Sequence, residues 1–126
     1  MNYFVNKQEL VDVNVYVFEE NGRIEAVNEE KDVPKDKKAT KLLFQFKRPN
    51  NKDSNNIMKK GHKIINDQYE LNNAAIQEEA LRILLADWNL TDENGNKIEY
   101  SVAKLESLDP AIARTAFLGL ISKVSI

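Results

Sequence analysis

Alternating apolar positions predict a strand near the start of the chain. Val13, Val15 and Val17 recur at every second residue, which is the pattern of a strand with one protected face. The pair Asn21-Gly22 follows and favours a type I′ turn, because both central positions of that turn need a positive φ. The predicted hairpin register places Tyr16 opposite Val27, Val17 opposite Ala26 and Glu20 opposite Arg23.

A polar connection and a third strand come next. Residues 29–40 are rich in lysine and lack apolar periodicity, so we expect an exposed and mobile segment. From Leu42 to Phe46 every second residue is apolar and shares one face. Pro49 then ends the strand, because proline has no backbone donor for the sheet.

Two helices are predicted in the middle of the chain. In the first, Ser54 acts as the N-cap and an apolar side runs from Ile57 through Gly61 to Ile64 and Ile65. The second extends from Glu70 to Trp88. Its apolar stripe follows the spacing i, i+3, i+4, i+7 at Leu81, Leu84, Leu85 and Trp88, widened by Ile76, Ala80 and Ile83.

The last third contains a turn and two further helical segments. Asn94-Gly95 turns the chain, and Ser101 caps one helical turn that runs through Leu105. Asp109 and Pro110 then supply a cap and a first-turn proline for a terminal helix. Its expected apolar stripe is Ala113, Ala116, Phe117, Leu120, Ile121 and Val124, with Arg114, Thr115 and Ser122 opposite.

These elements predict one α+β domain over residues 1–126. Residues 1–50 are expected to be mainly β, as an N-terminal antiparallel hairpin or three-stranded sheet. Residues 51–126 are expected to be mainly α, as a C-terminal helical part of two to four helices. The predicted core residues are Phe44, Phe46, Leu81, Leu84, Trp88, Phe117 and Leu120.

Residue counts remove most catalytic chemistry from consideration. The 126 residues include no cysteine and one histidine, His62, so thiol catalysis, disulfides and histidine-rich metal clusters are excluded. No phosphate-binding loop or dinucleotide fingerprint occurs. We therefore expect a binding or assembly protein that is not an enzyme and needs no cofactor or metal. No apolar run approaches the roughly 20 residues that span a bilayer.

Charge is segregated along the chain although the net charge is only −2. Residues 1–30 carry two basic and seven acidic side chains, residues 31–63 carry eleven and three, and residues 64–126 carry five and ten. The blocks therefore have net charges of −5, +8 and −5. Such blocks can join copies of the chain head to tail into a homo-oligomer, or simply balance within one molecule.

The basic block also supports an alternative function. Residues 41–50 interleave aromatic and basic side chains, as single-stranded nucleic-acid surfaces do, so a nucleic-acid-binding accessory protein using residues 31–63 is the second hypothesis. Against it, Phe44 and Phe46 share a face with Leu42, which favours a place in the core. The candidate partner-binding residues are Lys47, Arg48, Lys52, Lys59 and Lys60.

Three short motifs between residues 41 and 126 carry a family resemblance. A strand ends in Phe-x-Phe-Lys-Arg-Pro at residues 44–49, and a helical segment ends in Ala-Asp-Trp at 86–88, followed by Thr-Asp-Glu-Asn-Gly at 91–95. Leu105, Leu108, Asp109 and Pro110 then introduce the terminal helix. This arrangement resembles the tail assembly chaperones of tailed bacteriophages. The valine-rich N-terminal hairpin departs from that family, which leaves a tail or neck component of the virion open.

The resemblance implies a non-enzymatic role in phage morphogenesis. Proteins of this family cover hydrophobic helices of the tape measure protein and recruit tail-tube subunits. It therefore implies those two proteins as partners, with the chain located in the host cytoplasm during assembly or in the virion. It carries over no catalytic residue. A homo-oligomer that acts through protein–protein contacts is the function we expect, with no part for a membrane.

Overall fold

The computed structural model describes the backbone of residues 1–126 and every side chain except those of Lys63, Ile64, Ile65 and Tyr69. The chain is α+β, with a four-stranded antiparallel sheet in the order β2-β1-β3-β6 and a separate two-stranded ladder, β4-β5. In chain order the elements are β1 (Leu10–Glu20), β2 (Arg23–Val27), a 3-10 turn (Glu30–Asp32), β3 (Thr40–Lys47), α1 (Asn51–Gly61), β4 (His62–Ile65), β5 (Gln68–Leu71), α2 (Asn73–Leu84), β6 (Leu85–Trp88), α3 (Val102–Glu106) and α4 (Pro110–Ile121).

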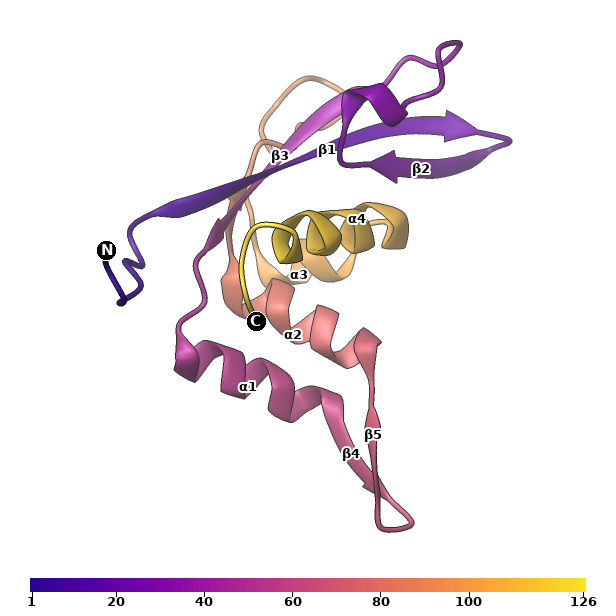
Figure 1. Ribbon diagram of the computed structural model, residues 1–126. Helices are drawn as coiled ribbons and strands as arrows, with labels where there is room; N and C mark the ends of the chain where they lie inside the picture. The colour runs from indigo at the N-terminus through magenta and orange to yellow at the C-terminus, as the bar shows by residue number, and fades with distance from the viewer.

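The helices are stacked below one face of the sheet. Figure 1 shows α4 lying across the sheet, α2 below α4, and α1 below α2. The β4–β5 hairpin connects α1 to α2 and projects away from the sheet. The N-terminal segment lies at the start of β1, at the opposite end of the sheet from the β1–β2 turn (Figure 1).

The predicted N-terminal hairpin is confirmed, including its register. Tyr16 pairs with Val27 and Glu20 with Arg23. Asn21 and Gly22 have φ values of 53° and 75°, as a type I′ turn requires. This turn fixes which side chains of β1 face the helices, because a shift of one residue would move all of them to the other face.

Strand β3 also forms as predicted, and its inner face provides the centre of the core. Phe44 and Phe46 are fully buried, and they pair with Val13 and Val11 of β1 respectively. Pro49 follows the strand. The two aromatic rings and the β1 valines therefore form the surface against which the helices pack.

The predicted helix from Glu70 to Trp88 is wrong at both ends. Glu70 belongs to β5, and α2 begins only at Asn73, where the Asn72 side chain accepts a hydrogen bond from the Ala75 N–H at 3.1 Å. At the other end the chain leaves α2 after Leu84 and forms β6, the fourth strand of the sheet. Residues 51–126 thus contain three strands that the apolar pattern did not predict.

An irregular register explains the error in β6. Leu85 pairs with Phe46 and Trp88 with Phe44, and the register shifts between Gln45 and Phe46. A bulge of this kind lets two residues three apart face the same side, which imitates the spacing of a helix. Both Leu85 and Trp88 are buried. Trp88 meets Phe44 edge to face, with 6.2 Å between ring centroids, and its Nε1–H donates to the Ile98 carbonyl at 2.8 Å.

Helix α1 begins and ends earlier than predicted. Its N-cap is Asn50 and not Ser54: Asn50 Oδ1 accepts from the Asp53 N–H at 2.9 Å, and the Asp53 carboxylate accepts from the Asn50 N–H at 3.1 Å. This reciprocal capping box satisfies two backbone N–H groups, whereas a single serine cap would satisfy one. The helix ends at Gly61, so Ile64 falls in β4, and the predicted facing of the Ile64 and Ile65 side chains lies outside the described residues.

Gly61 stands where α1 and α2 approach each other closely. A Cβ atom there would lie 2.1 Å from Cγ1 of Ile76, so a larger residue would force the helices apart. The segment 29–40 is less exposed than predicted: it contains the 3-10 turn, and its Val33 and Pro34 are partly buried beside Tyr16.

The predicted starts of the last two helices are confirmed. Ser101 caps α3 by accepting from the Lys104 N–H at 3.1 Å, and Asp109 caps α4 by accepting from the Ala111 N–H at 2.9 Å, with Pro110 in the first turn. The buried side of α4, however, is rotated from the predicted stripe. It consists of Ile112, Thr115, Ala116, Gly119 and Leu120.

The edge of β1 that extends past β2 is covered by side chains. Residues 10–15 pair with β3 on one side, while the β2 ladder begins only at Tyr16. In a two-residue hairpin the even-numbered residues of β1 direct their backbone groups towards the β2 side. There Lys123 Nζ donates to the Asp12 carbonyl at 2.5 Å, and Asn28 Nδ2 donates to the Asn14 carbonyl at 3.0 Å.

Candidate functional site

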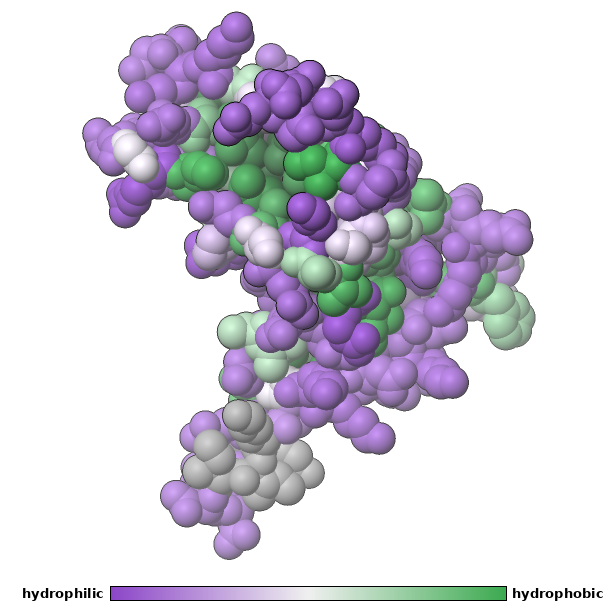
Figure 2. All heavy atoms as spheres, turned by 180° about the vertical axis from the view of Figure 1, so that it is seen from behind, coloured by the Kyte–Doolittle hydropathy of each residue, from purple (hydrophilic) through white to green (hydrophobic). Residues whose placement is uncertain are grey.

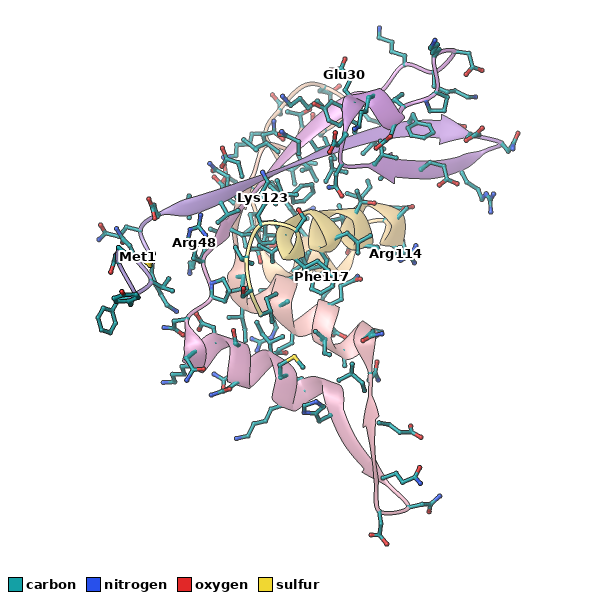
Figure 3. All side chains as sticks on the ribbon, viewed as in Figure 1. Met1, Glu30, Arg48, Arg114, Phe117 and Lys123 are labelled. Atoms are coloured by element: carbon teal, nitrogen blue, oxygen red, sulfur yellow. The ribbon has the colours of Figure 1, made fainter. Side chains whose placement is uncertain are left out.

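A groove lies between α2 and α4 on the described surface. It has a volume of about 640 Å³. Its lining residues are Asn73, Ala74, Ile76 and Gln77 of α2 and Pro110, Arg114, Phe117, Leu118 and Ile121 of α4. We call this hollow the α2–α4 groove. Figure 3 shows Phe117 on the side of α4 that faces α2, and Arg114 one turn closer to the start of the helix.

The groove exists because α4 places its small residues towards the sheet. A Cβ at Gly119 would lie 2.4 Å from Cγ1 of Val13, so glycine allows the helix to approach β1 closely. Thr115 is buried on the same side, and its hydroxyl donates to the Ala26 carbonyl at 3.2 Å. Asn28 Nδ2 also donates to the Thr115 carbonyl at 3.0 Å. These contacts fix the rotation of α4 about its axis.

Three large apolar residues of α4, namely Phe117, Leu118 and Ile121, consequently lie outside its buried side. Leu118 is 49% exposed and Ile121 is 43% exposed. Phe117 was predicted to lie in the core, but it is only partly buried. Thr115 was predicted to lie on the polar face, but it is buried. Burial of a leucine, isoleucine or phenylalanine stabilises a protein by about 1.5–3 kcal/mol, so this face leaves a substantial gain unrealised in the isolated chain.

The polar groups of the groove are few and have distinct roles. Arg114 is the one charged side chain in its lining. Asn73 and Gln77 supply side-chain amides, which can both donate and accept hydrogen bonds. An apolar floor with a small number of polar groups at its rim is typical of sites that bind a protein segment or an apolar ligand.

A second hollow lies beside the same helix. It has a volume of about 360 Å³, lies between α2 and α3, and shares Gln77 with the α2–α4 groove. Arg82 lines it and forms an ion pair with Glu79 one turn away. The hydrogen bond and the charge of Glu79 raise the pKa of Arg82 above its ordinary value. Arg82 is therefore paired with its neighbour, and this hollow, which Glu78 and Glu106 also line, has more charged side chains than the α2–α4 groove.

The N-terminal segment also exposes large apolar side chains. Tyr3 and Phe4 are 82% and 84% exposed, and Met1 is fully exposed. We call residues 1–5 the arm. Its base is fixed, because Lys7 Nζ lies 2.6 Å from Oδ2 of Asp53 at the start of α1. Seen from behind, apolar residues gather between the strands and the helices, and the arm stands apart from them at one edge (Figure 2).

The five basic candidates do not converge on one site. Lys47 and Arg48 lie at the end of β3, and Lys52 lies in the first turn of α1; all three are exposed. Lys59 and Lys60 lie in the last turn of α1. These last two border a hollow of about 440 Å³ together with Asn56, Glu79, Arg82 and Ile83. The burial of Phe44 and Phe46 leaves the basic segment without the aromatic platform that base stacking requires.

In the part of the chain whose side chains are described, no group of three or more histidine, aspartate or glutamate side chains could hold a metal ion. Within the same part, no helix is long and apolar enough to cross a membrane. Comparison with protein-family models, with curated proteins and with solved structures found no match to this chain.

Sequence reasoning missed both the groove and the arm. Tyr3, Phe4 and Val5 are three apolar residues in succession, but the alternating pattern that predicted the first strand begins only at Val13. In α4 sequence reasoning assigned Ile121 to the buried stripe and overlooked Leu118. The available signal was an excess: α4 has more large apolar residues than one helix face can hold.

Proposed function

We propose that this chain is a non-enzymatic assembly protein of a tailed bacteriophage, a tail assembly chaperone or a small tail or neck component. It acts by binding an apolar helix of a partner protein in the α2–α4 groove. The observation that carries the proposal is the outward face of α4, where Phe117 is partly exposed and Leu118 and Ile121 are 49% and 43% exposed above an apolar hollow. The phage assignment is supported by the resemblance of residues 41–126.

The size of the groove suits a short amphipathic helix. Helix α4 has 12 residues, which corresponds to a length of about 18 Å, or roughly three turns of a bound helix. Such a helix offers apolar anchors at positions i, i+3 or i+4, and i+7. A carboxylate at one end of the bound helix would meet Arg114. The tape measure protein of tailed phages is the partner that the resemblance implies.

Co-expression with the tape measure protein encoded in the same genome tests the proposal. We expect the chain to keep that protein soluble and to co-purify with it. Ile121→Glu should abolish co-purification, because it places a charge in the apolar groove. The matched control is Ile24→Glu on β2: Ile24 is also 43% exposed, but it lies outside the groove. Equal binding by the two variants, or no binding by the unchanged chain, would overturn the proposal.

The nucleic-acid alternative retains one supporting observation, the hollow bordered by Lys59, Lys60 and Arg82. Titration with duplex and single-stranded DNA at low and then at physiological salt tests it, because phosphate-driven binding weakens steeply as salt rises. Micromolar binding that is salt-sensitive and is lost in Lys59→Glu/Lys60→Glu would favour this function over the assembly role. Absence of binding at low salt would remove it.

A further inference from the structure

We propose that the hollow between α1 and α2 binds the dianion of a phosphate monoester. These two helices lie side by side below the sheet (Figure 1). The hollow has a volume of about 440 Å³, and we call it the α1–α2 hollow. It shares no lining residue with the α2–α4 groove, so this inference does not rest on the proposed function. Its lining residues are Asn56, Lys59 and Lys60 of α1 and Glu79, Arg82 and Ile83 of α2.

A buried carboxylate holds the arginine of this hollow in one orientation. Glu79 is only 8% exposed, and a buried charge is costly unless it is paired. Both of its oxygens accept hydrogen bonds from Arg82: Nε donates to Oε2 at 3.3 Å, and Nη2 donates to Oε1. The guanidinium group is planar, so two bonds along one edge fix the direction of the whole group. Glu79 is therefore a positioning residue for Arg82.

The opposite edge of the guanidinium remains available for a ligand. Arginine has five N–H donors in one plane, and Glu79 accepts from two of them. The remaining donors are on Nη1 and Nη2, and the Arg82 side chain is 51% exposed. A guanidinium edge of this kind binds phosphate through two parallel hydrogen bonds. Arg82 can thus bind Glu79 with one edge and an oxyanion with the other.

Two lysines add positive charge at the same hollow. Lys59 and Lys60 belong to the last turn of α1, and both are exposed. Neither forms an ion pair with a carboxylate among the described side chains. A lysine is a compact point charge that binds phosphate without the fixed geometry of arginine. The hollow therefore combines one oriented pair of donors with two adaptable cations.

The charge of the lining indicates the class of ligand. Three cations and one carboxylate line the hollow, which leaves two positive charges in excess. A phosphate monoester carries about −1.5 to −2 at neutral pH. A carboxylate, or one backbone phosphate of a nucleic acid, carries a single negative charge. The monoester dianion consequently neutralises the hollow more completely than either of these groups.

A second basic hollow in the chain provides a matched control. It lies beside β1 and β3, has a volume of about 380 Å³, and is lined by Lys35, Lys37 and Lys41 with Glu30 as its one carboxylate. Its lining has the same excess charge but contains no arginine. Charge alone would attract phosphate equally to the two hollows. An oriented guanidinium group favours the α1–α2 hollow.

Amide chemical shifts measured by NMR during a titration with inorganic phosphate test the site. Chloride at the same ionic strength is the reference. The amides of residues 56–60 and 79–83 should shift and reach saturation, whereas those of residues 35–41 should shift little and without saturation. Equal shifts at the two hollows, or no saturation with millimolar phosphate, would overturn the proposal.

Glu79→Gln separates an oriented arginine from simple charge attraction. The substitution removes a negative charge from the lining, so charge alone predicts tighter phosphate binding. It also removes one of the two acceptors that orient Arg82, so the proposal predicts binding that is weaker by about twofold to tenfold. Circular dichroism checks that this variant is folded, because Glu79 is buried. Tighter binding by the folded variant would contradict the proposal.

Lys59→Gln/Lys60→Gln tests the site without disturbing the core, because both lysines are exposed. Loss of two charge-assisted hydrogen bonds should weaken phosphate binding at least about tenfold. Lys35→Gln/Lys41→Gln is the matched control: it removes the same charge from two exposed lysines of the other hollow and should leave the affinity unchanged. Equal losses in the two variants would mean that phosphate responds only to the total charge of the chain.

Two pairs of ligands identify the source of the phosphate. AMP should bind more tightly than adenosine, which lacks the phosphate. A single-stranded oligonucleotide with a terminal phosphate should likewise bind more tightly than the same oligonucleotide with a terminal hydroxyl. A difference in the first pair alone identifies a small phosphate ester as the ligand, and a difference in both pairs extends the site to nucleic-acid ends. Equal affinities within each pair would refute the monoester assignment.

Discussion

The two sides of α4 differ in a way that is unusual for a surface helix. The buried side carries Ile112, Thr115, Ala116, Gly119 and Leu120, and its glycine approaches the strands closely. The other side carries Phe117, Leu118 and Ile121, which are partly or largely exposed. An ordinary amphipathic helix would place polar residues at such positions.

This difference shows that packing of the monomer alone does not account for the composition of α4. The inner side is optimised for close approach: the Thr115 hydroxyl bonds β2, and a Cβ at Gly119 would collide with β1. The outer side has apolar area without a matching surface. Contiguous exposed apolar area is typical of interaction sites, and four substitutions can test the contrast between the two sides.

The largest effect should come from truncating one leucine on each side. Leu120 is fully buried, so Leu120→Ala should lower the free energy of unfolding by about 2–5 kcal/mol. Leu118 is 49% exposed, so Leu118→Ala should change it by less than about 0.5 kcal/mol. Urea denaturation of both variants measures the contrast. Similar losses would mean that the two sides are equally packed.

Gly119→Ala should have the next largest effect. Alanine favours a helix over glycine by about 1 kcal/mol. The added Cβ would, however, lie 2.4 Å from Cγ1 of Val13, and overpacking typically costs about 1–3 kcal/mol. We expect a net loss of stability in urea denaturation. Adding Val13→Ala should make the cost of Gly119→Ala smaller than in the unchanged chain, and a stabilised single variant would refute the close approach.

Thr115→Val should have a smaller effect, because it keeps the shape and removes only the hydroxyl. The lost hydrogen bond to the Ala26 carbonyl should cost about 0.5–1.5 kcal/mol. Ser107→Ala is the control: the Ser107 hydroxyl makes a bond of the same length, 3.2 Å, to the Ala103 carbonyl, but in an exposed position. Thermal unfolding of the two variants gives the comparison. An equal change in both would show that the buried bond has no special weight.

The smallest effect concerns the base of the arm and depends on pH. Burial raises the pKa of Asp53, but the hydrogen bonds from Lys7 and the Asn50 N–H, with the charges of Lys7 and Lys47, outweigh it and lower the pKa below the ordinary 3.8. The resulting stability is present above the ordinary value and is lost as pH falls through the lowered one. The gain is modest because the Lys7 side chain is 47% exposed.

Asp53→Asn removes this titration and makes the matched variant. Urea denaturation between about pH 6 and pH 3 should show a smaller acid-induced loss of stability for Asp53→Asn than for the unchanged chain. Identical pH profiles would show that the carboxylate has the same pKa in the folded and unfolded chains.

The sequence predicts elements well where local chemistry determines them. The Asn21-Gly22 turn specified the hairpin and its register, and Asp109 with Pro110 specified the start of α4. The sequence predicts an element poorly where its strand partner is distant along the chain. Leu85 and Trp88 have helical spacing in the sequence, and only their pairing with β3 reveals a bulged strand.

The candidate site was less predictable than the fold for a related reason. On a helix that is apolar on most sides, periodicity cannot indicate which side faces the sheet. In α4 that choice depends on Gly119 fitting against Val13 and on Thr115 bonding β2, and neither contact is visible in a single sequence. The five basic candidates are exposed, but their separation along β3 and α1 follows from the tertiary structure.

The covered edge of β1 bears on how safely such a protein can accumulate. Residues 10–15 extend beyond β2, and an uncovered edge of this length is a template for strand addition and fibril growth. Lys123 and Asn28 occupy the Asp12 and Asn14 carbonyls, so an incoming strand would first have to displace both side chains. These two contacts therefore oppose strand addition at an edge that β2 does not cover.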